Sequence, residues 1–205
     1  MPTPGILMRL SETPPNAPPQ SVTVEAIYTL GAKDDKAPSQ NTLYFLTDIE
    51  PLLSTRDAYN ADIAAHPDQA ISWILCSFIN GRDPNSTAAI TTPHVPTSPL
   101  PNSTLVINGS TPKPEAEADY HAWYDQEHGG KLALVPGWKA MRRYKQEKVY
   151  GEAETANFYG VNIYDEENGL GGPEWKAGVT DWTMRIRSNA AKPNVRRVWR
   201  VLKTE

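Results

Sequence analysis

Apolar and polar positions alternate through the second half of the chain in segments that read as strands and helices in turn. Strands are predicted at 104–109, 138–146, 157–165 and 195–203, and helices at 114–134 and 171–186. The strand at 195–203 mixes valines with arginines, a pattern that leaves one strand face in water. The order strand, helix, strand, strand, helix, strand is the ferredoxin-like order.

The first half gives a similar order with one helix missing. Strands are predicted at 5–11, 21–30, 42–48 and 71–80, and a helix at 50–66. Residues 43–61 match 158–177 in position and character, because both run from a strand through an acidic turn into a helix. The Pro-rich loop ETPPNAPPQ stands where the second half has its first helix.

A second Pro-rich stretch divides the chain near its midpoint. Residues 83–103 carry five prolines and have the composition of an extended linker. The predicted organisation is a degenerate ferredoxin-like unit at 1–82, the linker at 83–103, and a complete unit at 104–205.

Two such units predict an α+β fold in which two four-stranded sheets face one another with helices outside. This is the intramolecular form of the dimeric α+β barrel, built from two tandem ferredoxin-like units of which the first lacks its first helix. Two loosely tethered modules are the alternative. We prefer the joined barrel, because a lone four-stranded unit without one helix would leave apolar sheet surface uncovered.

Charge and composition narrow the classes of partner. The net charge of −4 gives no electrostatic reason to expect nucleic acid or an anionic membrane surface. The basic cluster near the end is interpreted as solvation of strand and helix ends. It consists of Arg185, Arg187, Arg196, Arg197 and Arg200.

The chain contains no apolar run of 18 residues and no signal-peptide pattern, so no membrane partner is expected. The lone Cys76 lies in the apolar run ISWILCSFI and is predicted to be a core thiol. A single cysteine suits a reducing compartment, and a cytoplasmic location is expected.

Candidate chemistry gathers in residues 115–138, EAEADYHAWYDQEHGGKLALVPGW. On a helix, Tyr120, Tyr124 and His128 lie on nearly one stripe. A histidine with a near-neutral pKa can act as the acid or base, and the Tyr124 hydroxyl can hydrogen-bond a phenolate or enolate oxygen. The alternative is that the aromatic residues seal the helix against its sheet, while His128 ends the helix before Gly129.

The strand after this helix carries Arg142 and Arg143. Strand alternation predicts that one points inward and the other to solvent. An inward Arg142 would bind a substrate carboxylate or enolate, with Tyr144 on the same face. A salt-bridged arginine is the alternative. Tyr159 and Asn162, on the next strand, are further candidates to reach the cavity.

Two other patterns carry weaker signals. His121, Asp125 and His128 share a helical face at metal-ligand spacing, but no fourth ligand is evident and no metal is predicted. The glycines of GLGGPEW at 169–175 predict a tight turn with Pro173 at the start of a helix, because the lysine and hydroxyl residue of a phosphate loop are missing.

The motifs WYDQEH at 123–128, VPGW at 135–138, RRY at 142–144 and GLGGPEW at 169–175 together resemble a known family. The chain is similar to the EthD-like proteins of fungal secondary metabolism, in the dimeric α+β barrel superfamily. The resemblance covers 104–203 and reaches the first half only through 5–11 and 42–66.

That resemblance implies a small-molecule enzyme without a cofactor. The family's members include decarboxylases, anthrone oxygenases, polyketide cyclases and lactone isomerases. This sequence departs from the family by losing the first helix and any acidic–aromatic motif there, which suggests one pocket per chain.

The leading hypothesis is a cofactor-free cyclisation, decarboxylation or isomerisation of a polyketide- or terpenoid-derived intermediate. His128 would be the acid–base group, with Tyr124 and Arg142 stabilising the oxyanion. The candidate substrate-binding residues are Tyr120, Trp123, Asp125, Trp138, Tyr144, Tyr159, Asn162 and Trp175.

Two other functions stay open: a cofactor-free anthrone-type oxygenase, and a non-catalytic binding or stress-related barrel. The face left by the missing helix is also a candidate surface for a homodimer partner.

Overall fold

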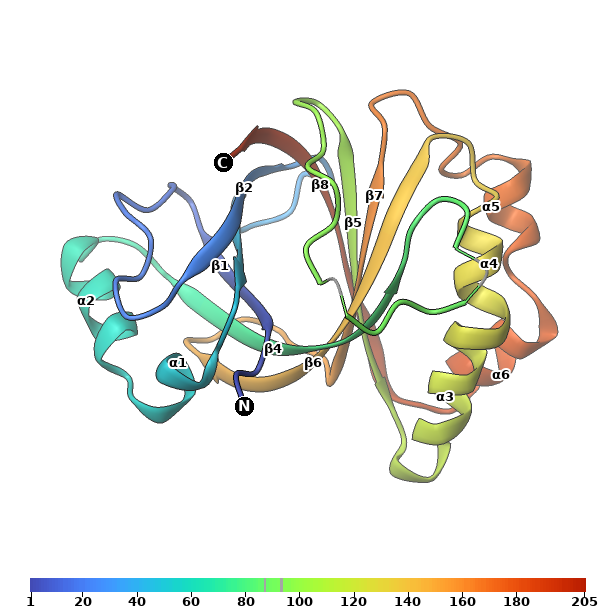
Figure 1. Ribbon diagram of the computed structural model, residues 1–205, viewed down its shortest axis with the longest axis horizontal. Coiled ribbons are helices and arrows are strands. Elements are labelled where there is room, and N and C mark those ends of the chain that lie inside the picture. Colours follow the sequence, from blue (N-terminus) through green and yellow to red (C-terminus); the bar gives the residue numbers. More distant parts are fainter. Residues whose placement is uncertain (87, 93) are drawn as a thin grey trace.

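The computed structural model describes residues 1–86, 88–92 and 94–205. Within these residues, eight strands close into a single antiparallel barrel in the order β1-β3-β2-β8-β5-β7-β6-β4 (Figure 1). The sheet runs without interruption from one half of the chain to the other. The α+β fold with a closed barrel, predicted from the sequence, is therefore confirmed.

The first half of the chain supplies β1 (Gly5–Ser11), β2 (Val24–Ala32), β3 (Gln40–Leu46), α1 (Glu50–Ser54), α2 (Asp57–Ala65) and β4 (Ser72–Arg82). The second half supplies β5 (Thr104–Pro112), η1 (Pro114–Ala116), α3 (Glu117–Trp123), the π-helical turn η2 (Tyr124–His128), α4 (Gly129–Leu132), β6 (Trp138–Tyr150), β7 (Phe158–Tyr164), α5 (Pro173–Ala177), α6 (Asp181–Ser188) and β8 (Ala190–Thr204).

Each half contributes four neighbouring strands, in the orders β4-β1-β3-β2 and β8-β5-β7-β6. Two seams join the halves, one between β2 and β8 and the other between β4 and β6. The helices α1 and α2 lie outside the first half, and α3 to α6 lie outside the second (Figure 1).

Buried apolar residues form three layers. The barrel interior is filled by side chains from both halves, among them Tyr28, Phe45, Cys76 and Trp199. Burial raises the pKa of the Cys76 thiol, as expected for a core cysteine. The other two layers lie between the sheet and the outer helices, one on each half.

The Pro-rich segment 83–103 does not hang free between the halves. His94 is buried, with its ring 5.9 Å from the ring of Phe78 and 6.2 Å from that of Phe45. The hydroxyls of Tyr28 and Tyr144 donate to the carbonyls of Pro96 and His94, at 3.2 and 3.1 Å. The part of the segment at His94 and Pro96 thus packs against the barrel interior. Pro93, counted in the Pro-rich pattern, lies outside the described residues.

The predicted elements are all present, with changes at helix ends. The helix predicted at 50–66 divides into α1 and α2, and that predicted at 171–186 divides into α5 and α6. Pro173 opens α5 as predicted, and the Thr180 hydroxyl caps α6 by accepting from the Thr183 N–H at 3.1 Å. Gly129 does not end the preceding helix, which continues through α4 to Leu132.

No helix within 1–86, 88–92 and 94–205 is long and apolar enough to cross a membrane.

Candidate functional site

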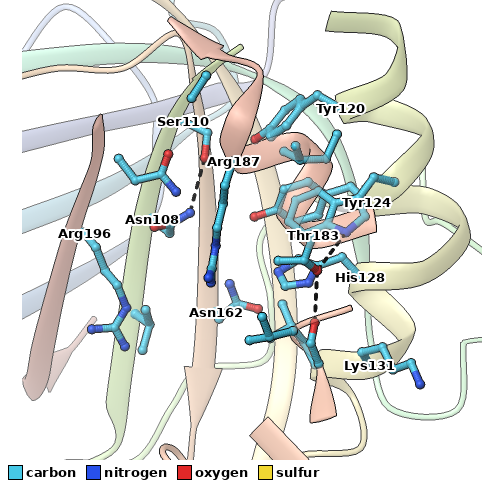
Figure 2. A pocket seen from close by; sticks show the side chains of 18 of the residues that line it. Asn108, Ser110, Tyr120, Tyr124, His128, Lys131, Asn162, Thr183, Arg187 and Arg196 are labelled. Atoms are coloured by element: carbon cyan, nitrogen blue, oxygen red, sulfur yellow. Dashed lines mark hydrogen bonds between the residues drawn. The ribbon is translucent and has the colours of Figure 1, made fainter. Parts of the chain in front are cut away.

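A cavity of about 480 Å³ lies on the outer face of the second half, between strands β5, β7 and β8 and the helices α3 to α6 (Figure 2). We call it the sheet–helix pocket. Its apolar and aromatic lining includes Val106, Tyr120, Trp123, Tyr124, Leu132, Val135, Tyr164, Leu170, Trp175, Val179 and Ile186. Its polar lining includes Asn108, Ser110, Thr111, His128, Lys131, Asn162, Thr183, Arg187, Lys192, Asn194 and Arg196.

The π-helical turn η2 shapes the helical wall of this pocket. The Gly129 N–H donates to the Tyr124 carbonyl, five residues earlier, which makes the turn wider than an α-helical one. The wider turn places the His128 ring flat on the Trp123 indole, with centroids 3.9 Å apart and planes 17° apart. In an α-helix, residues five apart point roughly 140° away from each other. The stacked pair therefore depends on the π turn.

His128 is neutral in this environment. Burial, together with the positive charges of Arg187 and Arg143, lowers the pKa of its imidazole to about 3. The near-neutral pKa assumed from the sequence is therefore wrong. Its Nδ1 atom is buried and has no hydrogen-bond partner among the described residues. A neutral ring with an unpartnered nitrogen can accept a hydrogen bond or a proton from a ligand.

Two tyrosines line the pocket beside this histidine. The rings of Tyr124 and His128 meet edge to face, with centroids 5.1 Å apart, and Tyr120 packs against Tyr124 at 5.3 Å. Burial raises the pKa of both tyrosines, so both stay protonated and can donate. The Tyr124 hydroxyl lies over Gly160, where a Cβ atom would be only 2.8 Å from it. Gly160 therefore makes the space for this hydroxyl.

Arg143 lies beneath the same helix. It donates to Asp125 at 3.0 Å and contacts Nδ1 of His121 at 2.6 Å, and its guanidinium lies 4.3 Å from the centre of the Tyr124 ring. Both Arg142 and Arg143 are buried, so the expectation that one of them faces solvent is wrong. The reason is that helix α3 covers the outer face of β6, which would otherwise be wet.

Arg142 does not line the sheet–helix pocket. Its guanidinium donates to Asp83 at 2.7 Å and to the Met141 carbonyl at 3.0 Å. Tyr144 and Tyr159 belong to the barrel interior, where Tyr159 accepts from the Ala156 N–H at 2.9 Å. The structure thus places these three predicted site residues away from His128.

The other predicted residues lie in or directly behind the pocket wall. Tyr120, Trp123, Tyr124, His128, Asn162 and Trp175 all line it. Trp138 stands behind Asn162, and its indole N–H donates to the Asn162 side chain at 3.4 Å. Asp125 is turned away from the pocket, because it accepts from Arg143 and from Asn80, each at 3.0 Å.

The three residues with metal-ligand spacing are separated in the fold. His121 and Asp125 both contact Arg143, whereas His128 stacks on Trp123. Across the part of the chain that the structure describes, no group of three or more His, Cys, Asp or Glu side chains is placed to hold a metal ion.

Polar contacts lock α6 against α3 and so fix the pocket's helical wall. Asp119 accepts from Arg185 at 2.8 Å and from the Trp182 indole at 3.0 Å. The Trp123 indole donates to the Thr183 hydroxyl at 3.3 Å, and that hydroxyl donates to the Gly178 carbonyl at 3.1 Å. These bonds hold Trp123, the platform under His128.

Several pocket residues were not predicted. Asn108 shares the outward face of β5 with Val106, and Arg196 lies directly opposite it on β8. Arg187 follows Thr183 by one helical turn, so both face the cavity. Of the basic cluster interpreted as solvation, Arg187 and Arg196 therefore line the pocket. The alternation of Lys192, Asn194 and Arg196 along β8 is the sequence signal that could have revealed this.

A second cavity, of about 580 Å³, lies on the first half. The Pro-rich loop lines it from Pro15 to Ser21. The structure therefore has a second cavity, where the sequence suggested one pocket per chain. Its buried arginine is fully engaged, because Arg9 donates to both carboxylate oxygens of Asp62 at 2.7 and 3.0 Å. Trp73 donates to the same carboxylate at 2.8 Å.

Comparison with known proteins gives information on the fold. No family model matches the sequence, and no curated protein matches it. Among solved structures, an anthrone oxidase-like protein superimposes with a TM-score of 0.66 at 14% identity, covering 99% of this chain and 92% of that one. A candidate monooxygenase from Fusobacterium nucleatum subsp. nucleatum superimposes with a TM-score of 0.62 at 11% identity, covering 100% and 94%. These likenesses show a shared fold.

Proposed function

We propose that the chain is a small-molecule oxygenase that works without a bound cofactor, on an electron-rich aromatic substrate held in the sheet–helix pocket. The observation that carries this proposal is the neutral His128 ring, which lines an aromatic-walled cavity of about 480 Å³ and whose buried Nδ1 has no partner among the described residues. A cavity of that size and lining suits a flat, largely apolar molecule of two or three rings.

In the proposed oxygenation, the main chemical role of the protein is to accept one proton from the substrate and later return it. A benzylic C–H of the substrate gives its proton to the His128 imidazole, and the resulting carbanion is stabilised as the phenolate or enolate. The negative charge of that anion offsets the Arg187 and Arg143 charges that lower the imidazole pKa, and so makes the ring a stronger base during the reaction. The Tyr124 hydroxyl and the side-chain amides of Asn108 and Asn162 are the donors available for that oxygen. The carbanion transfers electrons to O2, and the new C–O bond carries a peroxide that takes back the proton. Loss of water from the hydroperoxide leaves a ketone, so both atoms of O2 and both hydrogens of the methylene are accounted for.

Oxygenation takes precedence here over the cyclisation, decarboxylation or isomerisation expected from the sequence. The two proteins of similar fold carry oxidase-like and monooxygenase names, which favours the oxygenase alternative. Arg142 has no part in this proposal, because it lies outside the pocket and is paired with Asp83.

The finer description of the fold belongs to the same proposal. The repeated strand order of the two halves supports two tandem ferredoxin-like units, and the motifs at 123–128 and 135–138 support an EthD-like protein. A role in secondary metabolism would follow from that resemblance.

The test is oxygen uptake by the purified protein with anthrone as substrate, followed with an oxygen electrode and by the absorbance of the quinone product. His128→Asn should lower the rate by about 100-fold, because loss of a positioned acid–base group typically costs at least that much. His66→Asn, the same change in the first half, serves as the matched control and should leave the rate unchanged.

Equal rates for the wild type and His128→Asn would remove His128 from the reaction. A wild-type protein that consumes no oxygen with anthrone or hydroxylated anthrones would favour the non-catalytic binding barrel instead.

A further inference from the structure

The charges that line the sheet–helix pocket are all of one sign. Lys131, Arg187, Lys192 and Arg196 contribute to the lining, and no Asp or Glu is among the described lining residues. His128 adds no positive charge, since it is neutral. The chain as a whole carries a net charge of −4, so this concentration of cations is local and runs against the overall charge.

The two arginines of the pocket have no carboxylate partner, whereas the buried arginines of the described residues do. Arg9, Arg142, Arg143 and Arg197 each form an ion pair with an aspartate at 2.7 to 3.0 Å. Among the ion pairs of the described residues, none includes Arg187 or Arg196. Their charge is therefore available to a ligand.

Arg187 and Arg196 approach the pocket from opposite walls. Arg187 extends from helix α6, and Arg196 stands on strand β8 beside Asn108. Figure 2 shows the Arg187 side chain reaching into the pocket, with its guanidinium between the side chains of Arg196 and Asn162 in this view. An anion held here would face two planar guanidinium groups, a geometry that suits a carboxylate.

The rest of the pocket lining is largely apolar, so a ligand that fits it carries an apolar group next to its anionic group. Trp123, Tyr124 and Trp175 form aromatic walls, and the stacked Trp123–His128 pair presents a flat surface. We propose that the pocket selects an aromatic carboxylate, with its rings against these walls and its carboxylate between Arg187 and Arg196. This inference names a substrate class for the pocket and so rests on the proposed function, but its test does not depend on turnover.

The experiment uses a matched pair of probes, anthracene-2-carboxylate and its neutral analogue anthracene-2-carboxamide. Their dissociation constants for the wild-type protein are measured by isothermal titration calorimetry at pH 7. The carboxylate should bind at least about tenfold more tightly, because a hydrogen-bonded charge pair exceeds a neutral contact by about that factor. Added salt should weaken binding of the carboxylate and leave the carboxamide unaffected.

Substitutions then identify the residues that cause the preference for the carboxylate probe. Arg187→Gln and Arg196→Gln should each reduce the preference for the carboxylate about tenfold while leaving the affinity for the carboxamide unchanged. Arg200→Gln is the control, because Arg200 lies on β8 four residues after Arg196 and outside the pocket. All three side chains are exposed, so the variants should fold, and thermal unfolding checks that they do.

Equal affinity for the two probes in the wild-type protein, or no binding of either, overturns the proposal. So does a preference for the carboxylate that survives the double variant Arg187→Gln/Arg196→Gln. If the preference holds and oxygen uptake is absent, the oxygenase function fails while the carboxylate site stands. The reverse result, oxygen uptake with no preference, retains the function and removes the carboxylate site.

Discussion

At the scale of single residues, His128 couples pocket chemistry to stability. Burial and two nearby guanidinium groups keep its imidazole uncharged, with a pKa of about 3 against an ordinary value of 6.5. A lowered pKa in the folded state means that the unfolded chain binds more protons between these two values. Folding is therefore opposed increasingly as the pH falls from about 6.5 toward 3.

We expect this titration to show in the pH dependence of unfolding. Below pH 6.5, His128 should contribute a loss of up to about 1.4 kcal/mol of unfolding free energy per pH unit. His128→Asn should flatten the slope by that amount, as measured by urea unfolding at several pH values. His66→Asn is the control, because it makes the same substitution in the first half of the chain, and its slope of unfolding free energy against pH is compared with that of His128→Asn. Parallel slopes for the wild type and His128→Asn would show that the imidazole is not held neutral.

Gly160 gives a second prediction at this scale. A Cβ atom at Gly160 would lie 2.8 Å from the Tyr124 hydroxyl, so Gly160→Ala should displace that hydroxyl. We expect a loss of about 1–3 kcal/mol in stability from overpacking, together with weakened ligand binding. Gly109→Ala is the control, because its Cβ would meet Ala156 at 2.8 Å on the barrel side. Gly109→Ala should cost similar stability but spare binding, measured by denaturant unfolding and calorimetry.

The sequence predicted part of the site at this scale. Six of the proposed residues line the pocket. Four of them, Tyr120, Trp123, Tyr124 and His128, do so because the aromatic cluster on one helix faces its own sheet, and Asn162 and Trp175 lie on neighbouring elements. Neither Arg142 nor Arg143 lines the pocket, and strand alternation alone cannot say which face of β6 a helix covers. Arg187 was missed because a solvated arginine and a pocket arginine look alike on a short helix, and Arg196 because the polar alternation along β8 was interpreted as a solvated strand face.

At the scale of elements, the turn η2 is the feature that sequence periodicity could not supply. The helix at 114–134 was predicted, but a stripe of Tyr120, Tyr124 and His128 assumes uniform α-helical spacing. The Trp123–His128 stack arises only because five residues, Tyr124 to His128, form a π turn. Such turns occur often at functional sites, which agrees with its place in the pocket wall.

Removing one residue from this turn should restore α-helical spacing. Deletion of Gln126, which is exposed, should convert the π turn into an α-helical turn and leave Trp123 and His128 four residues apart, still on one helical face. We expect retained circular dichroism and an affinity for an aromatic ligand close to that of the wild type, measured by calorimetry. Gln126→Ala, the matched substitution, keeps the π turn and should also change neither property. A loss of affinity of about tenfold or more in the deletion variant alone would contradict the view that the π turn serves to bring these two rings onto one face.

The strands were predicted more securely than the helices. Their alternating patterns are long, and both strand runs and turns carry clear signals in this chain. The breaks at 55–56 and 178–180 were not predicted, because short helices joined by a single turn look like one amphipathic segment. Thr180 marks the break between α5 and α6, because its hydroxyl accepts from the Thr183 N–H and so caps the start of a new helix.

At the scale of the whole molecule, the described part of the segment 83–103 contributes His94 and Pro96 to the packing of the barrel. Composition indicated a linker, and proline content alone cannot distinguish a free linker from one fixed by tertiary contacts. The hydroxyls of Tyr28 and Tyr144 provide those contacts here. The division into units at 1–82 and 104–205 stays a prediction.

The double variant Tyr28→Phe/Tyr144→Phe should loosen this segment. Each lost bond should cost about 1 kcal/mol, and the freed segment should become sensitive to thermolysin. Tyr59→Phe is the control, because the Tyr59 hydroxyl donates to the Ile71 carbonyl at 3.0 Å on the outer face of the first half. It should lower stability without new cleavage in 83–103, as judged by mass spectrometry of the fragments. Equal cleavage in both variants would mean that the two bonds do not hold the segment.

The seams between β2 and β8 and between β4 and β6 both join parts of one chain. In a barrel assembled from two chains, seams of this kind would form by association, and mass action would open them on dilution. Here closure is unimolecular, so the unfolding midpoint should not depend on protein concentration. A second copy of the chain, if one binds, would add contacts to a barrel that is already complete.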